Sequence, residues 1–218
     1  MNSKETPRWV RHNGFYCCYG KRILDLILTV PALIMLAPIL AAIALLIRGT
    51  IGRPVFFRQQ RPGFYGKPFT LFKFRTMRDA PDDPNKVFSD FARLTSIGQR
   101  LRRLSLDELP ELINVLIGDM SLVGPRPLLM QYLERYTPDQ AGRHEVKPGI
   151  TGWAQVNGRN TTTWEERFRL DIWYVNHVKM GLDMKILALT VWKVIKREGI
   201  NQPGHPTMKE FMGSGDRA

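Results

Sequence analysis

The apolar run from Leu26 to Ile47, "LILTVPALIMLAPILAAIALLI", decides how the rest of this 218-residue chain must be arranged. Its 22 residues carry no charge, and as a helix they would extend roughly 33 Å at about 1.5 Å per residue, enough to cross the hydrocarbon core of a bilayer. The run is longer than the apolar part of a cleavable signal peptide, and no small-residue cleavage pattern accompanies it. The sequence therefore predicts a membrane helix that the chain keeps.

Basic residues stand on both sides of this run, and a proline lies near its middle. Because basic flanks favour the cytoplasmic side of a membrane, both ends of the run are expected there, which a straight crossing does not allow. Pro38 lacks a backbone N–H and clashes with the preceding turn, so it is a natural place for a break. Two readings stay open from these residues: a re-entrant helical hairpin broken at Pro38, or a kinked transmembrane helix. The flanking charges are Arg8, Arg11, Lys21 and Arg22 before the run and Arg48, Arg53, Arg58 and Arg61 after it.

The composition narrows the class of partner. A formal net charge of +12 and a pI near 10.0 indicate an anion, whether nucleic acid, anionic lipid headgroups or a phosphorylated substrate. The only two cysteines, Cys17 and Cys18, are adjacent and form neither a disulfide framework nor a metal knuckle. The sequence has no P-loop, no GxGxxG, no GxSxG and no histidines at metal-ligand spacing. An enzyme with this sequence must take its acid, base and nucleophile from carboxylates.

The organisation of the chain follows changes in composition. We predict a basic N-terminal segment at 1–22, the membrane helix at 23–50, a catalytic domain at 51–200 and a flexible tail at 201–218. The β-prone segments "RPVFFRQQ" and "KPFTLFKFRTM" are separated by a turn rich in Pro and Gly, which predicts a β-hairpin with Lys73 on one strand face. The tryptophan-bearing runs 164–178 and 182–197 predict amphipathic helices that either cover a core or lie in the membrane interface.

Two adjacent carboxylates, Asp107 and Glu108, lie within "RRLSLDELPELINVLIGDM". Ser105 and Glu108 match a capping box, which would make the pair a helix cap. Arginines surround the pair, however, with Arg102 before it and Arg126 in the "GPRP" turn after it. Such a cluster binds phosphate oxygens and would let a carboxylate attack a phosphoryl group if a divalent cation screened the repulsion. The residues alone leave both interpretations open.

The motifs "KRILDLIL", "RQQRPG", "FKFRTM", "LSLDELPEL", "GDMSLVGPRPL" and "KPGITGWAQVNGRN", in this order, resemble the monotopic phosphoglycosyl transferases, or bacterial sugar transferases, of the small PglC-like type. The resemblance implies transfer of a sugar 1-phosphate from a UDP-sugar, most commonly an N-acetylated amino sugar, to undecaprenyl phosphate with release of UMP. It places the reaction at the cytoplasmic face of the bacterial inner membrane, as the first membrane step of glycoconjugate or polysaccharide synthesis, before downstream glycosyltransferases.

The resemblance also implies roles for single residues. Asp107 would attack the β-phosphate and form a covalent phosphosugar intermediate, and Glu108 would assist with Mg²⁺, bound by both carboxylates, or as a base. Two interpretations of "TGWAQVNGRN" stay open: a donor site, or a structured loop with no role in binding. The expected phosphate-side and nucleotide-side contacts are Lys73, Arg102, Pro125 and Arg126, and the donor-site candidates are Gln155, Asn157 and Arg159.

The resemblance favours the re-entrant, monotopic arrangement over the kinked span, although many members carry a serine where this chain has Ala37. The predicted fold class is therefore α+β and mainly helical, with an N-terminal re-entrant membrane hairpin, a small β-hairpin and interfacial amphipathic helices. The alternative function is a non-catalytic, membrane-anchored basic module that binds anionic lipid or nucleic acid. Nucleic acid is not expected, because the basic residues are dispersed and no zinc finger or RNP motif is present.

Overall fold

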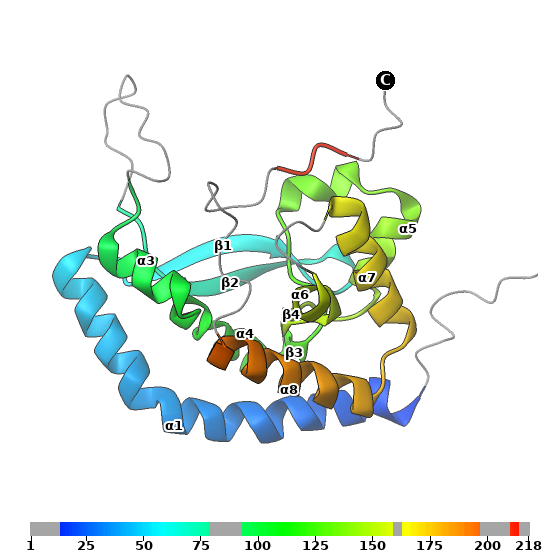
Figure 1. Ribbon diagram of the computed structural model, residues 1–218, viewed down its shortest axis with the longest axis horizontal. Coiled ribbons are helices and arrows are strands. Elements are labelled where there is room, and N and C mark those ends of the chain that lie inside the picture. Colours follow the sequence, from blue (N-terminus) through cyan, green and yellow to red (C-terminus); the bar gives the residue numbers. More distant parts are fainter. Residues whose placement is uncertain (1–13, 79–92, 159–162, 197–209, 214–218) are drawn as a thin grey trace, which may run out of the picture.

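The computed structural model describes residues 14–78, 93–158, 163–196 and 210–213. The described part is mainly helical with two small sheets, so the predicted α+β class is confirmed (Figure 1). The long helices are α1 (Lys21–Thr50), α7 (Trp164–Asn176) and α8 (Met180–Lys196). The shorter elements are η2 (Tyr16–Gly20), β1 (Phe56–Pro62), η3 (Phe64–Gly66), β2 (Pro68–Phe74), α3 (Ser96–Arg103), η4 (Leu106–Glu108), α4 (Glu111–Ile117), β3 (Ser121–Val123), η5 (Met130–Arg135), α5 (Pro138–Ala141), η6 (Gly142–Glu145), β4 (Gly149–Thr151) and α6 (Trp153–Asn157).

The membrane helix α1 is continuous, where the sequence predicted a break at Pro38. Both Pro31 and Pro38 lie inside the helix, which bends between its dark blue and lighter blue halves in Figure 1. A proline removes one backbone hydrogen bond and pushes the preceding turn aside, and a bend is enough to relieve that clash. Together with the turn from Tyr16, α1 is long and apolar enough to cross a membrane by length and composition.

The N-terminal end of α1 is fixed by polar contacts to the body of the protein. Arg22 donates to the carbonyl oxygens of Val115 and Leu116 at the end of α4. The buried carboxylate of Asp25 accepts hydrogen bonds from Ser121 Oγ at 3.0 Å and the Leu122 backbone N–H at 2.9 Å. A charged group in an apolar helix therefore has its partners on β3.

The C-terminal end of α1 packs on the same body through apolar contacts. Ile43 and Ile47 are buried against Phe74 of β2 and Leu101 of α3. Between the two docked ends, side chains such as Ile34 and Met35 are 70% and 76% exposed. Apolar area of this extent is costly in water, so lipid is the medium that suits the middle of the helix.

The predicted β-hairpin is confirmed. β1 and β2 pair antiparallel from Phe56 opposite Phe74 to Pro62 opposite Pro68, and the connecting turn contains Gly66 at a positive φ of 73°, which glycine adopts without steric cost. One face of β2 buries Phe69 and Leu71, and alternation places Lys73 on that same face.

The "GPRP" turn directly follows the first strand of a second sheet. β3 and β4 pair in parallel, with Ser121 opposite Gly149 and Val123 opposite Thr151. The chains approach so closely that a Cβ on Gly149 would stand 2.0 Å from the backbone nitrogen of Gly124. Glycine is therefore required at position 149, where β4 passes the start of the turn.

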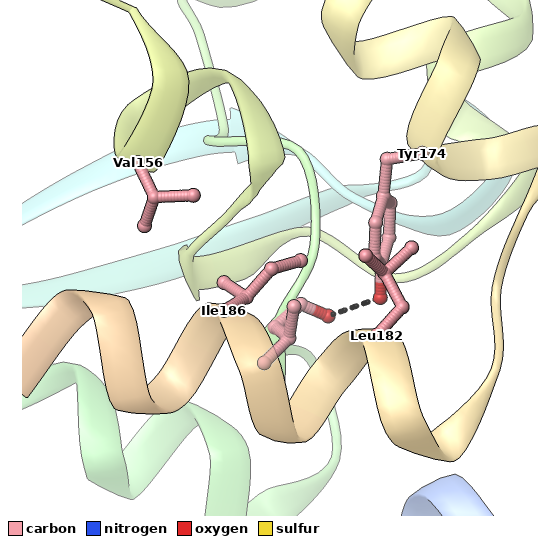
Figure 2. Close-up of a cluster of buried hydrophobic side chains, with 5 residues drawn as sticks. Val156, Tyr174, Leu182 and Ile186 are labelled. Carbon is pink, nitrogen blue, oxygen red and sulfur yellow. Dashed lines mark hydrogen bonds between the residues drawn. The ribbon is translucent and has the colours of Figure 1, made fainter.

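Helices α7 and α8 enclose the main apolar cluster with β3 and α6. Figure 2 shows Val156, Tyr174, Leu182 and Ile186 gathered there, and the Tyr174 hydroxyl lies 3.3 Å from the carbonyl oxygen of Val123. α8 is therefore amphipathic, as predicted, with an inner face on this core. Its other face exposes Met184, Val191, Trp192 and Ile195.

Part of the segment predicted as a flexible tail is docked. Within 201–218 the structure describes residues 210–213, and Phe211 is only 2% exposed. Its ring packs with Tyr132, Tyr136 and Phe168, and its backbone N–H donates to the Tyr132 hydroxyl at 3.1 Å. A Gly- and Pro-rich sequence gave no local signal for this contact, because the aromatic partners lie far away along the chain.

Replacement of Phe211 by Ala is expected to release the tail. Truncating a buried Phe typically costs about 3–5 kcal/mol, but the loss here is limited to the free energy that docks the segment, because the tail can detach locally. We expect faster proteolysis within the C-terminal twenty or so residues and a small fall in melting temperature. Met212→Ala, at the exposed neighbour, is the control, and equal proteolysis of both variants would contradict the docked tail.

Candidate active site

Asp107 and Glu108 lie in the single turn η4 between α3 and α4, and not in the first turn of a helix. Ser105 has a left-handed φ of 54° and its side chain makes no capping hydrogen bond. The capping-box interpretation is therefore wrong: α4 begins at Glu111, after Pro110. The carboxylate of Glu108 instead contacts partners from other segments, Lys73 of β2 and Arg126 of the turn after β3.

Glu108 is held by two cations. Lys73 Nζ on β2 lies 2.6 Å from its Oε1, and Arg126 donates from Nη1 to Oε2 at 3.2 Å and from Nη2 to Oε1. Burial by itself raises the pKa of Glu108, but Arg126 and Lys73 outweigh it and hold the pKa well below its usual range. Glu108 is therefore ionised, and its oxygens are already engaged.

Asp107 has a different environment. Its side chain is 8% exposed, yet no residue in the described part of the chain forms a hydrogen bond or ion pair with its carboxylate. Burial raises the pKa of Asp107 and the charge of Glu108 raises it further, while Lys73, Arg102 and Arg126 oppose both effects. Two neighbouring carboxylates thus differ in environment: Glu108 is neutralised by cations, and Asp107 has no hydrogen-bond or ion-pair partner among the described residues.

A third carboxylate, Glu111, was missed by the sequence analysis. It is 1% exposed, and its Oε1 lies 3.1 Å from Lys73 Nζ, in ion-pair contact but without hydrogen-bond geometry. Burial, aided by the charge of Glu108, raises the pKa of Glu111 to about 7, although Lys73 and Arg126 act against the shift. Its place three residues after Glu108 was the only signal in the sequence, since Lys73 arrives from the hairpin.

The structure brings together most of the predicted phosphate-side residues. Arg102 donates from Nε to Thr76 Oγ1 at 3.0 Å, and its charge acts on Asp107. The Pro125 carbonyl oxygen accepts from the Gly149 N–H at 3.1 Å, which fixes the turn that carries Arg126. Lys73, Arg102 and Arg126 therefore surround the dyad from three separate segments.

The predicted donor-site residues lie on or after α6 and are engaged locally. Gln155 Nε2 donates to the Ile150 carbonyl oxygen and Asn157 Nδ2 to that of Trp153, both at 2.9 Å. Arg159 lies outside the described residues. The role of these three side chains in binding a donor stays a prediction.

The carboxylates fit a magnesium ion only in part. Mg²⁺ binds proteins through one or two carboxylates and completes its shell with substrate phosphates and water. Asp107 has oxygens available for this, whereas both Glu108 oxygens are bound to cations. Among the described residues, no group of three or more His, Cys, Asp or Glu is placed to hold a metal. The arrangement fits a cation shared between Asp107 and a bound diphosphate, and not an all-protein cage.

Comparison with known proteins gives consistent matches over nearly the whole chain. Residues 16–197 match the family model described as bacterial sugar transferase. The uncharacterized sugar transferase EpsL of Bacillus subtilis (strain 168) is 56% identical over 196 residues, which are 90% of this chain and 97% of that protein.

Two further relatives carry names that specify a reaction. The UDP-glucose:undecaprenyl-phosphate glucose-1-phosphate transferase of Escherichia coli (strain K12) is 43% identical over 79% of this chain and 39% of its own length. The undecaprenyl-phosphate galactose phosphotransferase of Salmonella typhimurium is 37% identical over 82% of this chain and 41% of its own. The chain thus spans about two fifths of these two relatives.

Glu111→Gln should stabilise the protein at alkaline pH. The pKa of Glu111 is about 7 in the folded chain and about 4.5 when unperturbed, so between these values the folded state binds more protons and the free energy of unfolding falls as pH rises. Glutamine does not ionise, so the variant does not lose this free energy of unfolding as pH rises. At pH 8 the variant should be more stable by up to about 3 kcal/mol, and the difference should shrink toward pH 5.

Thermal unfolding in detergent at both pH values measures this difference. Glu134→Gln, at an exposed carboxylate, is the matched control and should show the same difference from the native chain at both pH values. A Glu111→Gln chain that is less stable than the native one at pH 8 would show that the ionised carboxylate is needed by Lys73.

Proposed function

This chain belongs to the bacterial sugar transferase family, and we propose that it transfers a sugar 1-phosphate from a UDP-sugar to undecaprenyl phosphate, releasing UMP. The single observation that carries the proposal is the pair of unlike carboxylates. Asp107 is buried with no hydrogen-bond or ion-pair partner among the residues that the structure describes, beside a Glu108 that two cations neutralise. The names of the Escherichia coli and Salmonella relatives support the same reaction class.

In the first step, an oxygen of Asp107 attacks the β-phosphorus of the UDP-sugar. The bond from that phosphorus to the oxygen bridging the two phosphates breaks, UMP leaves with the electron pair, and an aspartyl phosphosugar remains. Asp107 is suited to attack because no donor in the described chain occupies its lone pairs. Lys73, Arg102 and Arg126 reduce the repulsion between the carboxylate and the diphosphate, and their charges act on Asp107 already.

In the second step, a phosphate oxygen of undecaprenyl phosphate attacks the same phosphorus. The bond to Asp107 breaks, the carboxylate is regenerated, and the sugar is carried on undecaprenyl diphosphate, ready for downstream glycosyltransferases. The two displacements allow a soluble donor and a lipid acceptor to use one site in turn, which predicts ping-pong kinetics.

We propose Mg²⁺ as the cofactor, and Asp107 is the described carboxylate with oxygens available to hold it. When bound, the ion screens the negative charge that carboxylate and phosphates bring together. The sequence analysis expected Glu108 as a second ligand, and its contacts to Lys73 and Arg126 favour a supporting electrostatic role for this carboxylate. Arg126 would then bind a phosphate oxygen while remaining oriented by Glu108.

No single contact in the described site identifies the donor sugar. The relatives with specific names act on glucose and galactose phosphates, whereas the family resemblance led us to expect an N-acetylated amino sugar. UDP-glucose, UDP-galactose, UDP-GlcNAc and UDP-GalNAc therefore all belong in the first assay. Gln155, Asn157 and Arg159 are the side chains we would vary once a donor is found.

We propose that α1 enters the cytoplasmic leaflet of the inner membrane and returns. Both of its ends dock on one body, through Asp25 at the start and Ile47 near the end, and basic residues flank both ends. A helix that crossed the bilayer would carry one end, and the body attached to it, into or through the membrane. The exposed apolar face of α8 would lie at the same interface.

The alternative, a non-catalytic basic module anchored to the membrane, explains less of the site. Each cation would increase the affinity of such a module for its anionic partner, and carboxylates among the cations would lower that affinity. In this chain Glu108 forms ion pairs with two of the cations, and Asp107 is buried at a cost with no hydrogen-bond or ion-pair partner in the described part of the chain. A reactive role accounts for that cost.

Asp107→Asn should abolish turnover. Purified protein with undecaprenyl phosphate, Mg²⁺ and each UDP-sugar is assayed for UMP, and we expect the variant to lose at least about 1,000-fold, because an amide cannot act as the nucleophile. Asp119→Asn, at a partly exposed aspartate beyond α4, should retain activity.

The intermediate can be seen directly. Intact-mass measurement of the native chain, incubated with donor and Mg²⁺ but no lipid, should show the mass of one added phosphosugar, absent from Asp107→Asn. UMP release that is unchanged in Asp107→Asn would refute the assignment. Release from no donor, with lipid binding retained in both chains, would favour the anchored basic module.

The topology predicts the same accessibility for both ends of α1. With Cys17 and Cys18 replaced by serine, single cysteines at Ser3 and Gly49 are treated with a membrane-impermeant maleimide. Both should be labelled in inverted inner-membrane vesicles and neither in spheroplasts. Labelling of one site from each side would establish a transmembrane crossing instead.

A further inference from the structure

A buried ion pair contacts the backbone of the "GPRP" turn that carries Arg126. Arg143 of η6 and Asp171 of α7 are each 2% exposed. Arg143 donates from Nε and Nη2 to Asp171 Oδ2, at 3.1 and 2.7 Å. The same Nη2 donates to the backbone carbonyl oxygen of Arg126 at 2.8 Å. The pair thus reaches from α7 to the residue whose side chain holds Glu108.

The location of this pair calls for an explanation beyond stability. Burying two charges is expensive, and apolar residues of similar size often stabilise a fold as well or better. Here the guanidinium also satisfies a backbone carbonyl of the "GPRP" turn, and the preceding carbonyl, that of Pro125, accepts from Gly149. Two successive carbonyls of the turn are therefore fixed from outside it, which sets the direction in which the Arg126 side chain leaves the backbone.

We propose that Arg143 is a positioning residue for the transfer reaction, acting through Arg126, with Asp171 as its counter-ion. The proposal rests on the proposed function, because it assigns Arg126 to the phosphate side of the site. The hydrogen bond from Arg143 fixes the backbone of Arg126. The side chain of Arg126 is then held in one position, where it contacts Glu108 and would bind the donor diphosphate. A displacement of about 1 Å at such a site can cost about 100-fold in rate.

A purely structural role for Arg143 would have a different signature. If the ion pair only stabilised the fold, its loss would reduce activity by the same factor whatever stood at position 126. If Arg143 acts through Arg126, its loss should have no further effect once the Arg126 side chain is gone. Non-additivity of the two substitutions therefore separates the two roles.

The test is a double-mutant cycle with Arg143→Lys and Arg126→Ala, scored by kcat/KM for UMP release. We expect Arg143→Lys to lose about 10- to 100-fold in the native background and less than about threefold in the Arg126→Ala background. Equal losses in both backgrounds would overturn the proposal. Should Arg143→Lys fail to fold, Asp171→Asn replaces it in the same cycle, because it frees the guanidinium from its counter-ion.

Hydrogen–deuterium exchange gives a second readout that needs no activity. Arg143→Lys should increase exchange of the backbone amides in 121–128, the segment that contains the turn. The control is Glu166→Gln, which removes the exposed ion pair with Arg169 at 3.7 Å on the same helix as Asp171, and should leave exchange in 121–128 unchanged. Unchanged exchange in Arg143→Lys would overturn the positioning role. If the native chain released no UMP, the proposed function would fail, and the exchange comparison would still decide whether Arg143 holds the turn.

Discussion

The ion pairs of Glu108 with Lys73 and Arg126 join three segments that are distant in sequence. Lys73 comes from the hairpin, Glu108 from the turn before α4, and Arg126 from the turn after β3. Charge neutralisation at this point fixes where the three segments meet, and it leaves the adjacent Asp107 as the one carboxylate of the dyad without a partner in the described chain. The contacts that neutralise Glu108 thus also distinguish Asp107, the carboxylate that we propose as the nucleophile.

A second set of contacts ties this site to the membrane. Arg22 caps the end of α4 and Asp25 binds β3, while Ile43 and Ile47 pack on β2 and α3. The helix that lipid would cover is therefore attached directly to the elements that flank the dyad. The proposed reaction moves a sugar phosphate from a soluble nucleotide sugar to a lipid phosphate, and in the proposed topology this attachment would hold the site at the height of the headgroups.

Several buried polar groups near the site link one element to the next. Asp25, Arg143 and Asp171 are each buried at a cost, and each has hydrogen-bond partners on a neighbouring element. Such contacts are poor sources of stability but demanding in geometry, because a small shift leaves a charge unpaired. Such contacts are useful in a protein in which one short turn must hold Arg126 and another must hold Asp107 at fixed positions.

The sequence by itself determined the features that depend on near neighbours. An uncharged run of 22 residues predicted the long apolar helix, and β-prone segments around a Pro- and Gly-rich turn predicted the hairpin. The ordered motifs predicted the family, which the comparisons confirm, and led to the proposal of Asp107 with Glu108. The tertiary structure decided that Glu108 binds cations and caps no helix, that Glu111 joins the site, that α1 passes through Pro38 unbroken and that Phe211 is docked. Those outcomes depend on partners such as Lys73, which stands 35 residues from Glu108, and ion pairing and burial at such separations follow from packing and leave no periodic pattern in the chain.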